Sequence, residues 1–322
     1  MSGTSKSRLL WPQLPATIQA EVGRIAGGRI VAARNCPGGF SPGLASRLRL
    51  DNGRRVFVKA MDGDAWPHEA VTYRAELTIA AALPEDVPAP RLHGTFDDGR
   101  WIVLVFEDVD GLEPSQPWTV ADLRRVVPAL EHMSAALTPS PVAAPADHPR
   151  LGGWAELAAD AGCLAKLVSR SPWAVENLDR LIHLEQRGLA AAATGNTLLH
   201  FDTYAHNILL APQRVWFVDW PHARLGHPLV DLVLLLSSAA ADGIDPEPFV
   251  AEPFVAEPSV AEPSVAGAEQ PALDGILAAN AGFLLAGGLS EPVPGLEAIP
   301  RMKLHLGTGA LGWLHRRLSS DG

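Results

Sequence analysis

Short apolar runs of strand length dominate the first third of the chain, and helical periodicity occurs at two places. The run 101–106 is apolar throughout and has the length of a buried strand. Residues 69–83 follow a helical pattern that ends before Pro84. The other elements predicted in this part are a helix at 14–25 and strands at 29–33, 46–50 and 56–60.

After Trp118 the pattern becomes helical. The predicted helices cover 120–136, 154–167, 174–193, 231–241, 272–286 and 302–318. A strand-rich part followed by a helix-rich part predicts an α+β fold with two lobes. We place the β-rich lobe at residues 1–110 and the helical lobe at residues 111–322.

A five-residue repeat interrupts the helical part. Glu247-Pro248-Phe249-Val250-Ala251 is followed by three related copies that end at Ala266. A proline at every fifth residue removes backbone donors and is incompatible with a helix interior or a central strand. We therefore expect a low-complexity insertion over 245–267, an extended linker rather than a folded repeat array. A functional lid is the alternative.

The charge of the chain is acidic and unevenly spread. Its 322 residues include 36 acidic and 26 basic side chains, for a formal net charge of −10. This balance excludes a general affinity for DNA or RNA, which requires clustered Lys and Arg. Residues 231–300 contain eleven carboxylates and no Lys, Arg or His. A ligand of this part is expected to be cationic; the alternative is a solvated acidic surface.

Cysteine content and hydropathy predict the compartment. Cys36 and Cys163 are too few for a disulfide framework and fit a reducing environment. No apolar leader precedes Trp11, and the longest apolar run, 232–241, is half as long as a membrane span. We expect a soluble cytoplasmic protein without a membrane partner.

The segment that begins at His200 carries the most specific chemistry. Two short apolar strands at 208–210 and 215–218 predict an antiparallel hairpin. Asn207 precedes its first strand and Asp219 follows its second, so both side chains are expected at the same open end. Asp202 lies five residues before Asn207. Two carboxylates and an amide oxygen that converge in this way suit Mg²⁺.

The spacing of these residues is that of a known pair of catalytic and metal loops. His200-x-Asp202-x-x-x-x-Asn207, then a strand and Asp219, matches the loops of protein-kinase-like phosphotransferases. One alternative is a structural loop with buried, satisfied polar groups. Another is a metal hydrolase using His200, Asp202 and His206, although this spacing fits no familiar metal-ligand pattern.

Upstream residues supply the other parts that a kinase needs. Lys59, on the predicted strand 56–60, is the candidate for holding phosphates. Glu76 on the following helix is the candidate for orienting this lysine, with Glu69 as the alternative. A nucleotide base is expected at the end of the strand 101–106, where Phe106 lines the site. Glu107 offers a carbonyl there and Val109 an amide.

Several of these motifs together carry a resemblance over nearly the whole chain. They are Lys59, Glu76, the His200–Asn207 loop, Asp219-Trp220 and the segments 38–43, 87–92, 106–111 and 226–231. The chain resembles the aminoglycoside phosphotransferase family, small-molecule kinases that share the two-lobe protein-kinase fold. The resemblance implies that Asp202 is catalytic, that Asn207 and Asp219 hold Mg²⁺, that Asp231 and His200 support the catalytic loop, and that Ser41 lies at the nucleotide.

The predicted activity is transfer of the ATP γ-phosphate to a hydroxyl of a small acceptor. From the acidic stretch we expect this acceptor to be cationic, such as an aminoglycoside or another amine-bearing natural product. A primary-metabolism kinase for choline, homoserine or an amino sugar is the first alternative. A kinase-like binding protein without turnover is the second.

Overall fold

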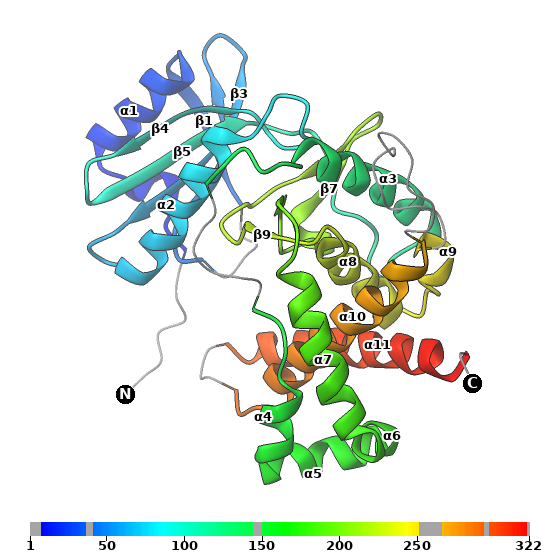
Figure 1. Cartoon of the computed structure of the whole chain (residues 1–322). Helices are drawn as coiled ribbons and strands as arrows, with labels where there is room; N and C mark the ends of the chain where they lie inside the picture. Colours follow the sequence, from blue (N-terminus) through cyan, green and yellow to red (C-terminus); the bar gives the residue numbers. More distant parts are fainter. Residues whose placement is uncertain (1–7, 37–40, 144–149, 251–265, 293–295, 321–322) are drawn as a thin grey trace. The chain divides into compact units, whose positions relative to one another are not determined.

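The computed structural model describes residues 8–36, 41–143, 150–250, 266–292 and 296–320 (Figure 1). The chain divides into two compact units. The first combines residues 1–113 with residues 207–223, and the second combines residues 114–206 with residues 224–322. The hairpin that follows Asn207 thus groups with the strand-rich first part, and the change of unit at 113/114 lies close to the boundary expected at 110/111.

An antiparallel five-stranded sheet forms the centre of the first unit, in the order β1-β2-β3-β5-β4. A short 3₁₀ helix, η1 (Trp11–Gln13), opens the described chain. The other elements are α1 (Ala16–Ala26), β1 (Ile30–Asn35), β2 (Leu44–Leu50), β3 (Arg55–Asp62), α2 (Pro67–Ala82), β4 (Leu92–Asp97) and β5 (Trp101–Glu107). The predicted strands and both predicted helices of this part are therefore confirmed.

Strand β4 is the element of this sheet that the hydrophobic pattern missed. It pairs with β5 and lies at the sheet edge. None of its residues is fully buried, and they include the polar or small residues His93, Gly94 and Asp97. An edge strand with one partner needs few apolar side chains, so its sequence gives only a weak periodic signal.

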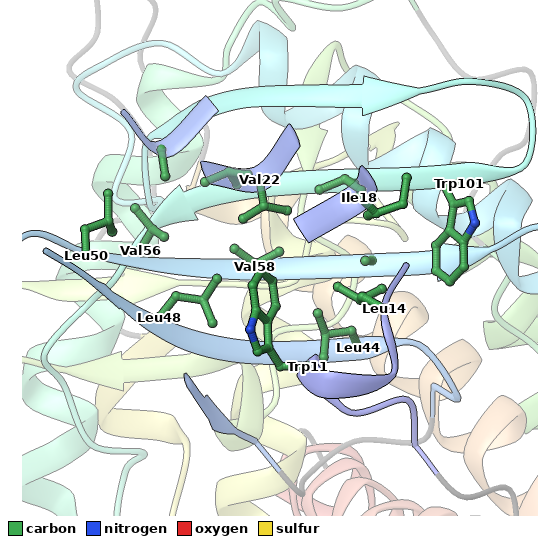
Figure 2. Close-up of a cluster of buried hydrophobic side chains, with 14 residues drawn as sticks. Trp11, Leu14, Ile18, Val22, Leu44, Leu48, Leu50, Val56, Val58 and Trp101 are labelled. Carbon is green, nitrogen blue, oxygen red and sulfur yellow. The ribbon is translucent and has the colours of Figure 1, made fainter. Parts of the chain in front are cut away.

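Helix α1 and helix α2 cover opposite faces of this sheet (Figure 1). Side chains of a strand alternate between the two faces. In β3, Val56 and Val58 pack with Ile18 and Val22 of α1, as Figure 2 shows. Met61 of the same strand packs on the other face with residues of α2. Lys59, two residues before Met61, is therefore directed to the α2 face.

A second, smaller sheet in this unit is the hairpin of β7 (Ile208–Leu210) and β8 (Val215–Phe217). Backbone hydrogen bonds join it to the first part of the chain. The amide of Phe217 donates to the carbonyl of Pro88 at 2.7 Å, and Leu210 and Leu112 form an isolated bridge. The predicted hairpin is present, with both strands at the predicted positions.

The second unit is mostly helical. Its two short strands, β6 (Thr197–Leu199) and β9 (Arg224–Gly226), pair with each other. The helices are α3 (Val120–Ala136), α4 (Trp154–Ala159), α5 (Ala161–Arg170), α6 (Pro172–Glu176), α7 (Leu178–Ala192), α8 (Leu229–Ala241), α9 (Glu247–Val250), α10 (Ala266–Leu289) and α11 (Ala298–Ser320). Helices α7 and α10 approach closely at two glycines: a Cβ added to Gly275 would lie 2.8 Å from Cα of Gly188.

Two differences from the predicted helices have a local cause. The helix predicted at 154–167 is interrupted at Asp160, whose side chain accepts a 2.8 Å hydrogen bond from the amide of Cys163 and caps α5. The helix predicted at 174–193 is likewise divided, into α6 and α7. The first copy of the repeat forms the single turn α9, not extended chain, and residues 251–265 lie outside the described residues.

Helix α10 is the one described helix long and apolar enough to pass a membrane-span test, over Gln270–Leu289. Within the structure, 67% of its most apolar window is buried. Leu277 and Ala281 are fully buried and belong to the hydrophobic interior of the second unit. Such burial is typical of a central core helix, which has the same composition as a span.

The core under α1 gives a stability prediction. Leu48 is 1% exposed there, whereas Val31 on β1 is 40% exposed. We expect Leu48→Ala to lower the free energy of unfolding by about 2–5 kcal/mol, because the substitution leaves a cavity. Val31→Ala, the control, should change it by less than about 0.5 kcal/mol. Urea unfolding followed by circular dichroism measures both; equal shifts would contradict this account of the core.

Candidate active site

Lys59 lies at the centre of a buried ion-pair cluster in the first unit. Its Nζ is 2.5 Å from Oε2 of Glu76 on α2 and 2.7 Å from Oδ1 of Asp219, which follows β8. Of the two carboxylates considered as its partner, Glu76 and Glu69, Glu76 is the one in contact. Three segments that are far apart in sequence therefore meet at one ammonium group.

The charges in this cluster depend on burial. The side chains of Lys59 and Glu76 are 12% and 3% exposed, whereas that of Asp219 is 46% exposed. Burial lowers the pKa of the Lys59 ammonium, but the carboxylates of Asp219 and Glu76 outweigh this effect and raise it. Burial raises the pKa of Glu76, and the charge of Lys59 opposes that shift. Lys59 is thus a fixed cation, and Asp219 is the accessible member of the cluster.

Tyr73 connects this cluster to the turn before β2, and the sequence did not indicate it. Its hydroxyl lies 3.2 Å from Oγ of Ser41, which accepts a hydrogen bond from the amide of Gly43 at 3.2 Å. A Cβ on Gly43 would collide with the Tyr73 hydroxyl, so the close approach requires glycine. The one available signal was that Tyr73 lies three residues before Glu76 and so shares its helix face.

The open end of the β7–β8 hairpin holds the two expected metal ligands. The amide of Val218 donates to the carbonyl of Asn207 at 2.9 Å, which places Asn207 and Asp219 at the same end. Asp219 has φ of 69°, a left-handed conformation that costs a non-glycine residue energy. This conformation, two residues beyond the end of β8, accompanies the contact with Lys59.

The oxygen donors at this end fit a hard divalent cation. Asn207 supplies an amide oxygen and Asp219 a carboxylate, the types that Mg²⁺ binds when substrate oxygens complete its shell. In the described part of the chain no group of three or more His, Cys, Asp or Glu forms a self-sufficient metal site. The donor set therefore suits a metal that is held jointly with a phosphate-bearing ligand.

In the second unit Asp231 holds the loop that carries Asp202. The two carboxylate oxygens of Asp231 accept the amides of His200 and Phe201 at 2.7 and 2.8 Å. The hydroxyl of Thr203 donates to the carbonyl of Asp231 at 2.8 Å. Phe201 has φ of 62°, so the loop turns sharply immediately before Asp202. Both His200 and Asp231 are buried.

The three residues expected at a nucleotide base lie at the end of β5 and just beyond it. Phe106 and Val109 are 7% and 6% exposed. The amide of Glu107 donates to the carbonyl of Arg91 at 2.8 Å, which ties the strand end to the residue before β4. The carbonyl of Val109 accepts a hydrogen bond from Arg47.

The expected site residues therefore form two groups, one in each unit. Those of the first unit are Ser41, Lys59, Glu76, Phe106, Glu107, Val109, Asn207 and Asp219, and those of the second unit are His200, Asp202 and Asp231. Lys59, Glu76 and Asp219 are in direct contact, and Asp231 contacts the loop of Asp202. Along the chain, Asp202 precedes Asn207 by five residues.

Comparison with known proteins identifies the family. The model of the phosphotransferase enzyme family matches residues 33–266, well over half of the chain. This chain belongs to the phosphotransferase enzyme family. The match includes every predicted site residue, from Ser41 to Asp231, and the protein is a small-molecule phosphotransferase. No match was found among curated protein sequences.

Solved structures agree with this assignment at the level of the fold. A thermostable mutant of aminoglycoside phosphotransferase APH(4)-Ia, in a ternary complex with ADP and hygromycin B, is 12% identical with a TM-score of 0.53. That comparison covers 94% of this phosphotransferase and 99% of the other chain. A choline/ethanolamine kinase family protein from Mesorhizobium loti is 17% identical with a TM-score of 0.54, over 94% and 97% of the two chains.

The brace at Asp231 gives a pH prediction. Burial raises its pKa to about 7 from 3.8, although the amides of His200 and Phe201 oppose the shift. A raised pKa means that the folded state binds the proton more tightly, so the stabilisation is complete below about pH 4 and is lost as the pH rises through about 7. The melting temperature of the natural protein should therefore exceed that of Asp231→Asn by more at pH 5 than at pH 8.

Differential scanning fluorimetry at the two pH values measures this excess. Asp179→Asn, at an exposed aspartate of the same unit, is the control for changing one carboxylate. An excess that grows from pH 5 to pH 8 would contradict the assigned direction of the shift.

Proposed function

We propose that this phosphotransferase transfers the γ-phosphoryl group of ATP to a hydroxyl of a small cationic acceptor in the cytoplasm. The observation that carries the proposal is the buried Lys59 ammonium between Glu76 and Asp219. A fixed cation beside a partly exposed carboxylate is the arrangement that binds phosphates together with a metal ion. Family membership supports the reaction class.

The charge of the cluster supports the proposal of a divalent metal at this site. One ammonium and two carboxylates carry a net charge of −1 when all three are ionised, which by itself repels phosphates. Asn207 and Asp219 are the residues that would hold Mg²⁺. When bound, Mg²⁺ neutralises phosphate oxygens and orients them for transfer. Lys59 then neutralises further phosphate charge, and Glu76 keeps its ammonium in place.

Asp202 is the proposed catalytic base. Its carboxylate orients the acceptor hydroxyl and takes its proton as the hydroxyl oxygen forms the new bond to phosphorus, and ADP leaves with the bridging oxygen. The loop that carries it is held by Asp231, with His200 in the same brace. The protein contributes mainly positioning and electrostatic stabilisation.

The nucleotide is proposed to lie along the α2 face of the sheet. Ser41, which is hydrogen-bonded to Tyr73, is near the phosphates. Phe106 lines the base site, where the carbonyl of Glu107 and the amide of Val109 pair with the base edge. The position of β5 beside β3, the strand of Lys59, supports these assignments.

The acidic excess of residues 231–300 supports a cationic acceptor. Lys166 and Arg317 form ion pairs with three of the eleven carboxylates, Glu247, Asp274 and Glu291, and Nε2 of His305 lies 3.1 Å from Oδ1 of a fourth, Asp242. Even with these three partners included, the stretch keeps an excess of negative charge. Aminoglycosides, other amine-bearing natural products, choline and ethanolamine all satisfy this electrostatic requirement.

Substitution of Asp202 tests the reaction. We expect Asp202→Asn to lower ATP-dependent phosphorylation on the order of 10²-fold or more, because the amide cannot accept the hydroxyl proton. Asp179→Asn, on the surface of the same unit, should keep full activity. Product formation by mass spectrometry and melting temperature are measured together. Undiminished turnover of the folded Asp202→Asn protein would end this assignment.

An acceptor panel tests the charge preference. ADP release is measured with aminoglycosides, choline and ethanolamine, and with neutral sugars, nucleosides and macrolides as controls. We expect larger kcat/KM for the cationic group and a decline of its advantage as salt rises, because salt screens charge attraction. Preference for neutral acceptors would contradict the electrostatic argument and leave the phosphotransfer itself standing.

A further inference from the structure

A buried carboxylate with two arginine partners lies where β5 ends. The side chain of Asp108 is 4% exposed. Its Oδ1 is 3.1 Å from Nη1 of Arg47 on β2, and its Oδ2 is 3.2 Å from Nε of Arg55 on β3. Removing such a carboxylate from water is costly, and the two guanidinium groups offset this cost as ion pairs, although Oδ1 of Asp108 accepts no hydrogen bond from the described residues. Asp108 thereby attaches the chain beyond β5 to two neighbouring strands.

Arg47 also holds the next residue through the backbone. Its Nη1 donates to the carbonyl of Val109 at 3.1 Å. One guanidinium thus contacts the chain on both sides of the Asp108–Val109 peptide group, at the Asp108 carboxylate and at the Val109 carbonyl. Among the described residues, no hydrogen bond is assigned to the amide of Val109. A nearly buried amide donor on a firmly held peptide is available for a ligand.

This clamp of Arg47, Arg55 and Asp108 lies on the same face of the sheet as Lys59. Ala45 of β2 pairs with Lys59, and Arg47 pairs with Phe57, so these four residues share one face. Arg55 precedes Lys59 by four residues on β3, a separation of about 13 Å at roughly 3.3 Å per residue. A nucleotide with its phosphates at Lys59 can span this distance and bring its base to Val109.

We propose that Arg47 is a positioning residue for the nucleotide base: it holds Asp108 and Val109 so that the Val109 amide donates to an acceptor on the base edge. This inference rests on the proposed function, because it requires a nucleotide on the Lys59 face of the sheet. Arg47 acts through the backbone, not by touching the reacting atoms. A purely structural clamp would support the whole sheet equally and would not distinguish the base from the phosphates.

The test compares a ligand that has a base with one that lacks it. ADP and inorganic tripolyphosphate, each with Mg²⁺, are titrated calorimetrically into the full-length protein and into Arg47→Met. We expect the Kd for ADP to rise on the order of tenfold, the effect of losing a charge-assisted hydrogen bond. The Kd for tripolyphosphate should stay within about twofold, since Lys59 is untouched. Arg49→Met is the matched control: Arg49 is an exposed arginine on the same strand face.

The outcomes separate this inference from the proposed function. Selective loss of ADP affinity in Arg47→Met, with Arg49→Met unchanged, supports it. Equal weakening of both ligands makes the clamp structural and overturns it, as does unchanged ADP affinity. If Arg47→Met does not fold, Arg47→Lys is judged by the same ratio, because lysine keeps the charge but its shorter side chain does not extend as far as Nη1 of the arginine, the atom that makes both contacts. A natural protein that binds neither ligand refutes the proposed function itself.

Discussion

The contact of one buried ammonium with two carboxylates is the constraint on which the site in the first unit depends. A buried charge is costly unless its partners are fixed, and Lys59 has partners from two distant segments, α2 and the end of β8. The hairpin that follows Asn207 therefore belongs to the same compact unit as residues 1–113. Its backbone bonds to Pro88 and Leu112 hold it in the register that this ion pair requires.

The alternation of β3 allows this polar cluster and a hydrophobic core to occupy one sheet. Val56 and Val58 pack against α1, in a core that also contains Trp11 and Trp101 (Figure 2). The opposite face is then available to Lys59, whose strand neighbours on that face, Phe57 and Met61, pack toward α2. Helix α1 thus contributes no candidate site residue. It buries apolar side chains on one face of the sheet and so stabilises it, while the opposite face of the sheet carries Lys59.

Sequence reasoning reached residues whose positions depend on local spacing and missed contacts that depend on register between strands. Lys59, Glu76, Asn207 and Asp219 could be located because periodicity and one hairpin determine where they lie. Strand β4, the Tyr73 hydroxyl and the clamp at Arg47 could not. The contact of Tyr73 depends on how closely α2 approaches Gly43, and the clamp at Arg47 depends on which residues of β2 oppose β3. The charge argument was also incomplete, since Arg317 forms ion pairs with both Glu247 and Asp274 and so offsets one of their two charges.

In each unit, a buried polar contact holds one of the candidate functional loops in a strained conformation. Phe201 precedes Asp202 with φ of 62°, and Asp219 has φ of 69°. Such residues cost on the order of 1–3 kcal/mol each and persist only where their surroundings determine them. Asp231 fixes the first loop by accepting hydrogen bonds from two backbone amides, and Lys59 fixes the second loop through its ion pair with Asp219. Both braces are buried, so relaxing either loop would leave a buried polar group with fewer partners. Strain at the loops and burial at their braces therefore stabilise one arrangement.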